Sequence, residues 1–196
     1  AIAEVLDVHH LVEPDRVAAR VDELLALVGL SGRGDVRPEQ LSGGQRQRVA
    51  IAKALAAEPD VLIADEAVSA LDVSVKASII NLLHDLRERL RLTMVFISHD
   101  LAVVSGICDR VLVMYRGRIV EESPTAALFT DARHPYTRAL LASVPRVGAP
   151  LGPRPIHVGE PPPGTSLGSS CLYAPRCPIS VERCLQEVPL LTGTGH

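Results

Sequence analysis

Residues 61–66, Val61-Leu62-Ile63-Ala64-Asp65-Glu66, combine a short apolar run with two adjacent acidic residues. An uninterrupted apolar run of this length is typical of a buried strand in a parallel sheet. Open α/β sheets bind their ligands at the carboxyl ends of the strands. The segment therefore predicts a parallel strand whose end offers Asp65 to Mg²⁺ and Glu66 to an attacking water molecule. The alternative is a strand that ends in two surface acids.

The segments on either side of this strand alternate between helical and strand patterns. Apolar residues recur at helical spacing over residues 15–28, from just after 44 to about 57, 74–91 and 101–108. Short apolar runs predict strands at 93–97, 111–115 and 118–121, with Arg116-Gly117 as the turn of a hairpin. This alternation predicts an α/β fold on a mostly parallel sheet.

Two further segments lie where such folds bind ligands. Leu41-Ser42-Gly43-Gly44-Gln45 precedes a helix, and backbone N–H groups at a helix N-terminus attract anions such as phosphate. A plain helix cap by Ser42 competes with that interpretation. Ser98-His99-Asp100 follows the strand at 93–97, so His99 can reach the same sheet edge as Glu66. The alternative is a capping serine and a surface histidine.

Taken together, these segments resemble the ABC ATPase family. Leu41 to Gln45 (LSGGQ) matches the ABC signature motif, residues 61–66 are similar to its Walker B segment, and Ser69-Ala70-Leu71-Asp72 resembles its D-loop. His99 matches the family's switch histidine, and the four motifs follow in the family's order. The resemblance implies the later half of a P-loop NTPase core of the ABC type, with part of the helical subdomain.

The resemblance also implies a role for each matched residue. In ABC ATPases two subunits close head to tail around two ATP molecules. Glu66 is then the general base, His99 contacts the γ-phosphate, and Asp65 binds Mg²⁺. Ser69 and Asp72 couple the two sites across the interface. The ATP bound by the other subunit is contacted by the signature residues Ser42, Gly43, Gly44 and Gln45.

Two departures and one further motif refine the resemblance. Ala67 stands where the family usually has proline, a variant associated with oligopeptide and dipeptide importers. Residues 133–141, with the letters HPYT at 134–137, are similar to the C-terminal region of peptide and nickel importer ATPases. No G-x-x-x-x-G-K-[ST] occurs in the sequence, so the phosphate-binding loop is expected upstream and this chain alone is expected to hydrolyse ATP negligibly.

A composition shift predicts two parts, a nucleotide-binding domain over 1–144 and an extension over 145–196. Ten of the 15 prolines lie from Pro145 onward. Cys171, Cys177 and Cys184 lie in the extension, and similar cysteines in related ATPases suggest an iron–sulfur cluster, against free or oxidised thiols. A fourth ligand is missing, because Cys108 is expected to be a core residue.

Charge and hydropathy exclude some functions. The net charge of −3 gives no support for nucleic-acid binding, and no apolar run approaches the roughly 18 residues that span a membrane. The resemblance implies a peripheral subunit on the cytoplasmic face of the membrane. Its partners are a second ATPase, two membrane permease subunits and, indirectly, a solute-binding protein. The alternatives are a docking module without hydrolysis and a soluble ABC-type ATPase.

Overall fold

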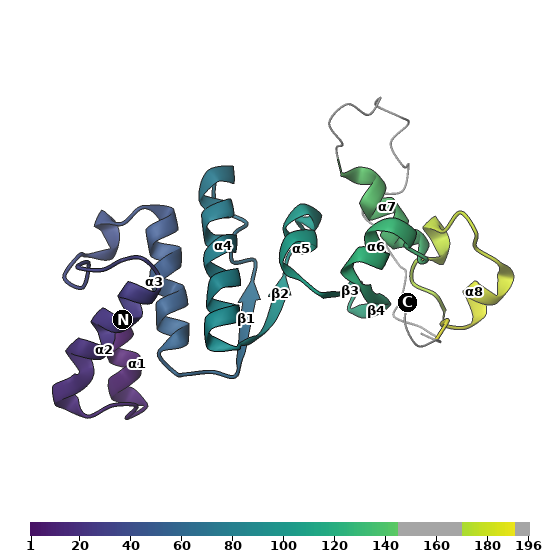
Figure 1. Ribbon diagram of the computed structural model, residues 1–196. Helices are drawn as coiled ribbons and strands as arrows, with labels where there is room; N and C mark the ends of the chain where they lie inside the picture. Colours follow the sequence, from purple (N-terminus) through teal and green to yellow (C-terminus); the bar gives the residue numbers. More distant parts are fainter. Residues whose placement is uncertain (145–169, 191–196) are drawn as a thin grey trace. The chain divides into compact units, whose positions relative to one another are not determined.

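The computed structural model describes residues 1–144 and 170–190, which belong to two compact units, residues 1–103 and residues 104–196 (Figure 1). The predicted boundary between residues 144 and 145 lies at the edge of the described part, so it stays a prediction. No helix in residues 1–144 or 170–190 is both long and apolar enough to cross a membrane.

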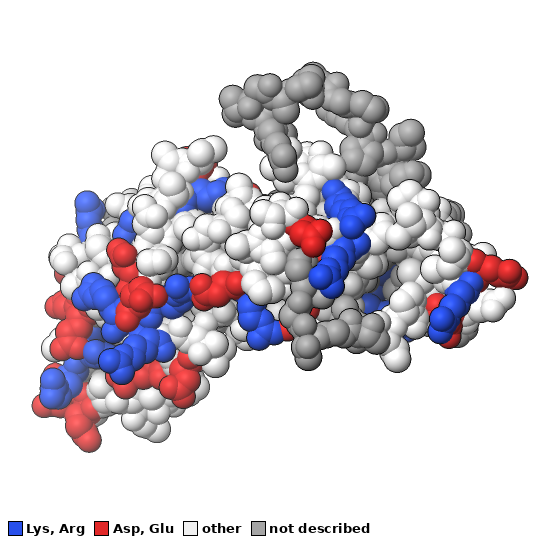
Figure 2. All heavy atoms as spheres, turned by 45° about the vertical axis from the view of Figure 1, so that its right-hand side comes forward, with Lys and Arg blue, Asp and Glu red and all other residues white. Residues whose placement is uncertain are grey.

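The first unit begins with three helices that pack on one another. They are α1 (Ile2–Val8), α2 (Val17–Leu27) and α3 (Gly43–Leu55), with short 3-10 turns η1 (Pro14–Arg16) and η2 (Pro38–Gln40) between them. Their apolar faces form a shared core, and the fully buried side chains include Leu6, Leu24 and Val28. Gly29 follows α2 with a φ of +72°, a conformation that glycine adopts readily just past the end of a helix. Acidic and basic side chains are interspersed over the face of this unit that Figure 2 shows.

The second half of the first unit is a parallel strand pair connected by a long helix. β1 (Val61–Asp65) pairs with β2 (Thr93–Ile97), and α4 (Val73–Leu90) makes the crossover between them. α4 packs alongside α3 and buries Ile79, Leu83 and Leu86, as its apolar spacing predicts (Figure 1).

The two strands are buried less completely than their sequence predicts. Leu62 and Ala64 are buried, but Val61, Ile63, Val95 and Ile97 are 50%, 66%, 46% and 47% exposed. Within the described residues the sheet has two strands, and one of its faces is uncovered. The apolar run at 61–64 indicated a strand buried on both faces, and for this chain that expectation is wrong.

The second unit contains an antiparallel hairpin followed by short helices. β3 (Arg110–Tyr115) pairs with β4 (Arg118–Pro124), and Arg116 and Gly117 in the turn have φ values of +49° and +79°. Positive φ at both central residues is the turn geometry that hairpins favour. The helices are α5 (Leu101–Ile107), which begins at the end of the first unit, α6 (Thr125–Asp131), α7 (Pro135–Ser143), η3 (Ala174–Arg176) and α8 (Glu182–Gln186). Because the described sheets are one parallel and one antiparallel pair, a mostly parallel sheet is not observed.

Candidate functional site

Glu66 lies directly after β1, at the carboxyl end of the parallel pair. Its backbone N–H donates to the carbonyl of Ile97 at 3.0 Å, which continues the ladder one residue beyond β1. Its φ of +47° lies in the left-handed region that a residue with a side chain rarely adopts. Such backbone strain clusters at functional sites, where the surrounding structure holds it. The strand therefore ends in a sharp turn at Glu66.

The Glu66 carboxylate contacts His99, which follows β2. Glu66 Oε1 lies 2.8 Å from His99 Nδ1, although 33 residues separate the two in the sequence. An ionised carboxylate only accepts hydrogen bonds, so Nδ1 carries the hydrogen and Nε2 points elsewhere. The side chains are 41% and 79% exposed, which leaves them accessible to a ligand. The structure thus brings together the two residues for which the sequence predicts catalytic roles.

Ser69 and Asp72 shape the segment that leads from Glu66 into α4. The Ser69 N–H and hydroxyl both donate to the carbonyl of Glu66, at 3.1 and 2.9 Å. Asp72 is the N-cap of α4 and accepts from the backbone N–H of Val75 and the hydroxyl of Ser74. These hydrogen bonds, the one from Val75 above all, lower the pKa of the Asp72 carboxyl below its ordinary value. Ser69 therefore holds the turn that follows Glu66, and Asp72 fixes the start of α4.

Ser42 and Gln45 form a reciprocal cap at the start of α3. Ser42 Oγ accepts from the Gln45 N–H at 3.3 Å, and Gln45 Oε1 accepts from the Ser42 N–H at 2.9 Å. The structure thus confirms that Ser42 caps α3, which was the alternative to phosphate binding. This cap leaves the hydroxyl hydrogen of Ser42 unused, so an anion at this helix N-terminus can still accept it.

The two glycines after Ser42 differ in their surroundings. Gly43 is exposed, and a Cβ there would meet Leu71 Cδ2 at an ordinary 3.7 Å. Gly44 is buried, and a Cβ there would lie 2.5 Å from Val75 Cγ1 on α4. The resemblance to ABC ATPases implied that both glycines contact ATP. For Gly44 the structure adds a different reason, the close packing of α3 on α4.

Asp65 is the last residue of β1 and is exposed. One carboxylate suits Mg²⁺, which usually takes one or two protein carboxylates and completes its shell with water and phosphate oxygens. Among the described residues, no group of three or more His, Cys, Asp or Glu side chains is arranged to hold a metal ion. The fit to Mg²⁺ therefore consists of a single ligand, Asp65, beside the carboxylate of Glu66.

Lys76 and Asp100 form an ion pair that the motifs did not indicate. Lys76 Nζ lies 2.8 Å from Asp100 Oδ2, and the Lys76 contact is the main reason that the pKa of Asp100 is lowered. Lys76 lies in the first turn of α4, four residues after Asp72, and Asp100 directly follows His99. A lysine one helical turn into an amphipathic helix is an ordinary surface residue, so no sequence signal distinguished it.

The HPYT segment in the second unit is held by a buried carboxylate. Glu121 on β4 is 4% exposed, and its two oxygens accept from the backbone N–H groups of Arg133 and His134 at 2.7 and 3.0 Å. His134 Nδ1 in turn accepts from the Tyr136 N–H at 3.1 Å and caps α7. Burial lowers the pKa of His134, against the opposing charge of Glu121. The segment is therefore a structured turn and helix start.

The predicted iron–sulfur ligands lie near one another but do not form a metal site. The Cys171 N–H donates to the carbonyl of Cys184 at 2.8 Å. Burial raises the pKa of the Cys177 thiol, and the neighbouring Cys171 and Cys184 act in the same direction. All three are free cysteines, and the described residues contain no group of three or more His, Cys, Asp or Glu side chains that could hold a metal ion. The structure gives the iron–sulfur expectation no support.

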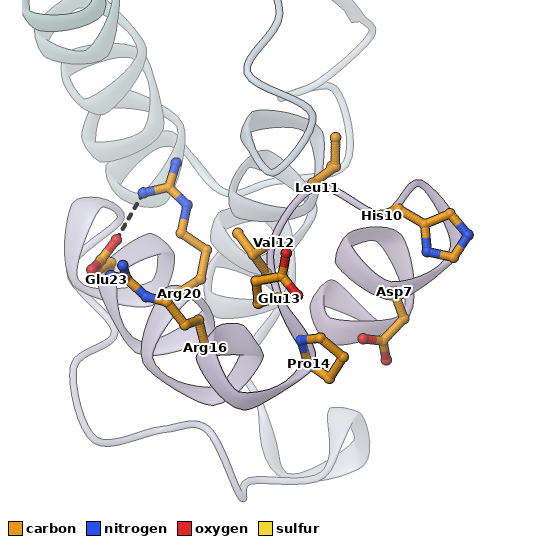
Figure 3. Close-up of a pocket in the computed structure, with 9 residues that line it drawn as sticks. All are labelled: Asp7, His10, Leu11, Val12, Glu13, Pro14, Arg16, Arg20 and Glu23. Carbon is orange, nitrogen blue, oxygen red and sulfur yellow. Dashed lines mark hydrogen bonds and ion pairs between the residues drawn. The ribbon is translucent and has the colours of Figure 1, made fainter.

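A cavity of about 670 Å³ lies away from all the predicted site residues. Figure 3 shows charged side chains of α1, of α2 and of the segment between them around it, including Asp7, Glu13 and Arg16. The ion pair from Arg20 to Glu23, drawn as a dashed line, closes one side at 2.8 Å. None of the predicted catalytic or nucleotide-binding residues lines this cavity. The cluster around Glu66 and His99 is instead an exposed edge.

Comparison with known families and structures defines the class of the protein. The family described as "ABC transporter" matches residues 3–69, and the family described as "Oligopeptide/dipeptide transporter, C-terminal region" matches residues 120–184. A crystal structure of an ATP-binding cassette of an ABC transporter, in its ADP conformation, is similar with a TM-score of 0.58 and 25% identity. The similarity covers 68% of this chain and 52% of that one. Fold and sequence thus agree on an ATP-binding cassette.

Curated relatives narrow the class further. A protein of Brucella abortus (strain 2308) named a peptide import ATP-binding protein is 50% identical over 198 residues, covering 100% of this chain and 58% of the relative. A peptide ABC transporter ATP-binding protein of Sinorhizobium fredii is 54% identical over 173 residues, covering 86% of this chain and 48% of the relative. The chain spans about half the length of the curated relatives it matches. It belongs to the ABC transporter ATP-binding proteins that carry the oligopeptide/dipeptide transporter C-terminal region.

Proposed function

We propose that this chain supplies the signature segment and the hydrolytic edge of an ATP-hydrolysing subunit that powers the import of peptides. The observation that supports the proposal most is the 2.8 Å contact between Glu66 and His99 at the carboxyl end of β1 and β2. The names of the relatives and the matched C-terminal region support peptides as the solute.

In this proposal Glu66 is the general base for the water that attacks the γ-phosphate. Its ionised carboxylate accepts a proton from that water, and His99 holds the carboxylate in place through Nδ1–H. Asp65 supplies a protein oxygen to Mg²⁺, which neutralises charge on the phosphates. The exposed position of all three side chains fits a site that is completed by residues outside this chain.

The signature segment contacts an ATP molecule held by a second ATPase subunit. The Ser42 hydroxyl and the first backbone N–H groups of α3 donate to the γ-phosphate, and the Gln45 side chain keeps the start of the helix closed. Ser69, which bonds to the Glu66 carbonyl, and Asp72, which caps α4, couple the two ATP sites across the subunit interface. The subunit binds two membrane permease subunits at the cytoplasmic face of the membrane, and they receive solute from an extracytoplasmic binding protein.

The test compares this chain with the full-length protein assembled with its membrane subunits in lipid vesicles. We expect ATP turnover only in the full-length assembly, and uptake of labelled peptides only when ATP is present. A full-length assembly that binds its membrane subunits but does not hydrolyse ATP would support the docking-module alternative. Turnover by the 196-residue chain equal to that of the assembly would contradict the proposed division of the site.

A further inference from the structure

The Lys76–Asp100 ion pair joins the start of α4 to the loop that follows β2. Its atoms Nζ and Oδ2 lie 2.8 Å apart, and the two side chains are 23% and 30% exposed. A pair that is mostly shielded from solvent is screened less by salt than a fully exposed one. The contact spans 24 residues of sequence, so it fixes one loop against a separate helix.

The other oxygen of the Asp100 carboxylate and the Asp100 backbone N–H form hydrogen bonds with residues on either side of His99. Its Oδ1 accepts from the N–H groups of Ala102 and Val103 at 3.2 and 3.3 Å, which caps the start of α5. Its own N–H donates to Ser98 Oγ at 3.0 Å. A shift of the Asp100 side chain would therefore move the backbone that carries the His99 ring.

His99 depends on that backbone for its position. Its side chain is 79% exposed, so packing against neighbours contributes little to its orientation. The ring must nevertheless place Nδ1 within hydrogen-bond distance of Glu66 Oε1, where it lies at 2.8 Å. A displacement of about 1 Å is enough to reduce catalysis strongly when a group must be held in one geometry.

We propose that Lys76 is a positioning residue for the reaction, which acts through Asp100 to hold His99 against Glu66. The inference depends on the proposed ATPase function. Lys76 suits this role because its backbone N–H donates to Asp72 O at 2.8 Å, in the capped first turn of α4. The adjacent Val75 packs on Gly44 of the signature segment. Lys76 thereby ties His99 to the turn that also contacts α3.

The test measures ATP turnover of the full-length protein in its transporter assembly for Lys76→Met, Lys76→Arg and the control Lys53→Met. Lys53 is the other lysine of the chain and is exposed on α3. We expect Lys76→Met to lower kcat about 10-fold, with a KM for ATP within about 2-fold of the unsubstituted protein. Lys76→Arg retains the positive charge and should recover most of kcat, and Lys53→Met should leave it unchanged.

A second variant separates positioning from general stability. Asp100→Asn should lower kcat as much as Lys76→Met. The double variant should lower kcat no further, because the two substitutions remove the same ion pair. Unchanged turnover in Lys76→Met would overturn the inference. A loss of turnover in Lys76→Met that Lys76→Arg does not restore would overturn it too, and so would a loss explained by a lower melting temperature alone. If the unsubstituted assembly has no turnover, the proposed function fails, and this inference fails with it.

Discussion

Gly44 lies where the start of α3 packs on α4, and a side chain there has no room. The sequence could show that a glycine follows Ser42, but it could not show that Val75, far along the chain, approaches it. For that reason the sequence explained both glycines by ligand binding. The structure distinguishes the roles of the two glycines. A Cβ added at Gly44 would lie 2.5 Å from another side chain, whereas a Cβ added at Gly43 would not come so close.

The substitution Gly44→Ala should destabilise the first unit by about 1–3 kcal/mol, since an added methyl group overpacks the helix contact. Gly43→Ala is the matched control, and it should be neutral or slightly stabilising, because alanine is the better helix former and finds ordinary contact distances. Urea unfolding of both variants measures the difference. Equal stability of the two would contradict the packing explanation.

Glu121 is a residue whose role no sequence pattern indicated. The strand register shifts between Val113 and Met114, so that Met114 pairs with Ile119 and Val113 with Glu121. The extra residue on β4 turns Ile119 outward and Glu121 inward, although the two would share a face in a regular strand. A bulge of this kind is decided by tertiary packing, which explains why the sequence does not reveal it.

We expect Glu121→Gln to destabilise the second unit by about 1.5–3 kcal/mol, because an amide offers one acceptor oxygen to two backbone N–H groups. The matched control is Glu122→Gln on the same strand, where the side chain is half exposed and pairs with Arg110. It should cost at most about 1 kcal/mol. Hydrogen exchange of the amides of Arg133 and His134 reports the loss directly, and unchanged protection in Glu121→Gln would refute this role.

At the scale of elements, spacing of apolar residues was a reliable guide. α2, α3 and α4 lie within a few residues of the predicted helices, and the hairpin turns at Arg116-Gly117 as expected. Local periodicity and turn chemistry determine these features, so a single sequence contains them. Burial of the second face of β1 and β2 depends on neighbouring elements rather than on local sequence. The expectation that both strands are buried was therefore wrong.

α7 should respond to pH through its N-cap. Burial holds the pKa of His134 below its ordinary value of 6.5, so the unfolded chain binds more protons than the folded one in mildly acidic solution. The stability that neutral His134 contributes is present above pH 6.5 and is lost as the pH falls from there through the lower folded pKa. As the pH falls from about 7 to about 5, amide exchange in α7 should therefore become faster relative to the intrinsic exchange rate.

His134→Asn tests this sign. An asparagine oxygen can accept from the Tyr136 N–H in place of Nδ1, and it does not titrate over this range. The variant should keep α7 protected at neutral pH and lose most of the pH dependence. The same dependence in His134→Asn as in the unsubstituted protein would assign it to another group.

At the scale of the whole molecule, the sequence predicted the contact between the two catalytic candidates, but not the ion pair behind it or the ligands of the site. Glu66 and His99 come together because parallel strands share a carboxyl edge, and that rule applies to the sequence alone. The ion pair of Lys76 and Asp100 depends on how α4 lies against β2, which no local pattern encodes. The roles of Ser42 and Asp65 depend on a nucleotide and a second subunit, so they remain proposals.

Whether Glu66 acts as the base is decided by ATP turnover of the full-length transporter assembly that carries Glu66→Gln. The amide retains the shape of the side chain but cannot accept the proton of water. We predict a fall in kcat of about 100-fold or more with little change in ATP affinity, because general bases contribute about 10²–10⁴-fold. Asp85→Asn, an exposed change on α4, should have no effect. Turnover of Glu66→Gln near the unsubstituted rate would show that Glu66 is not the base.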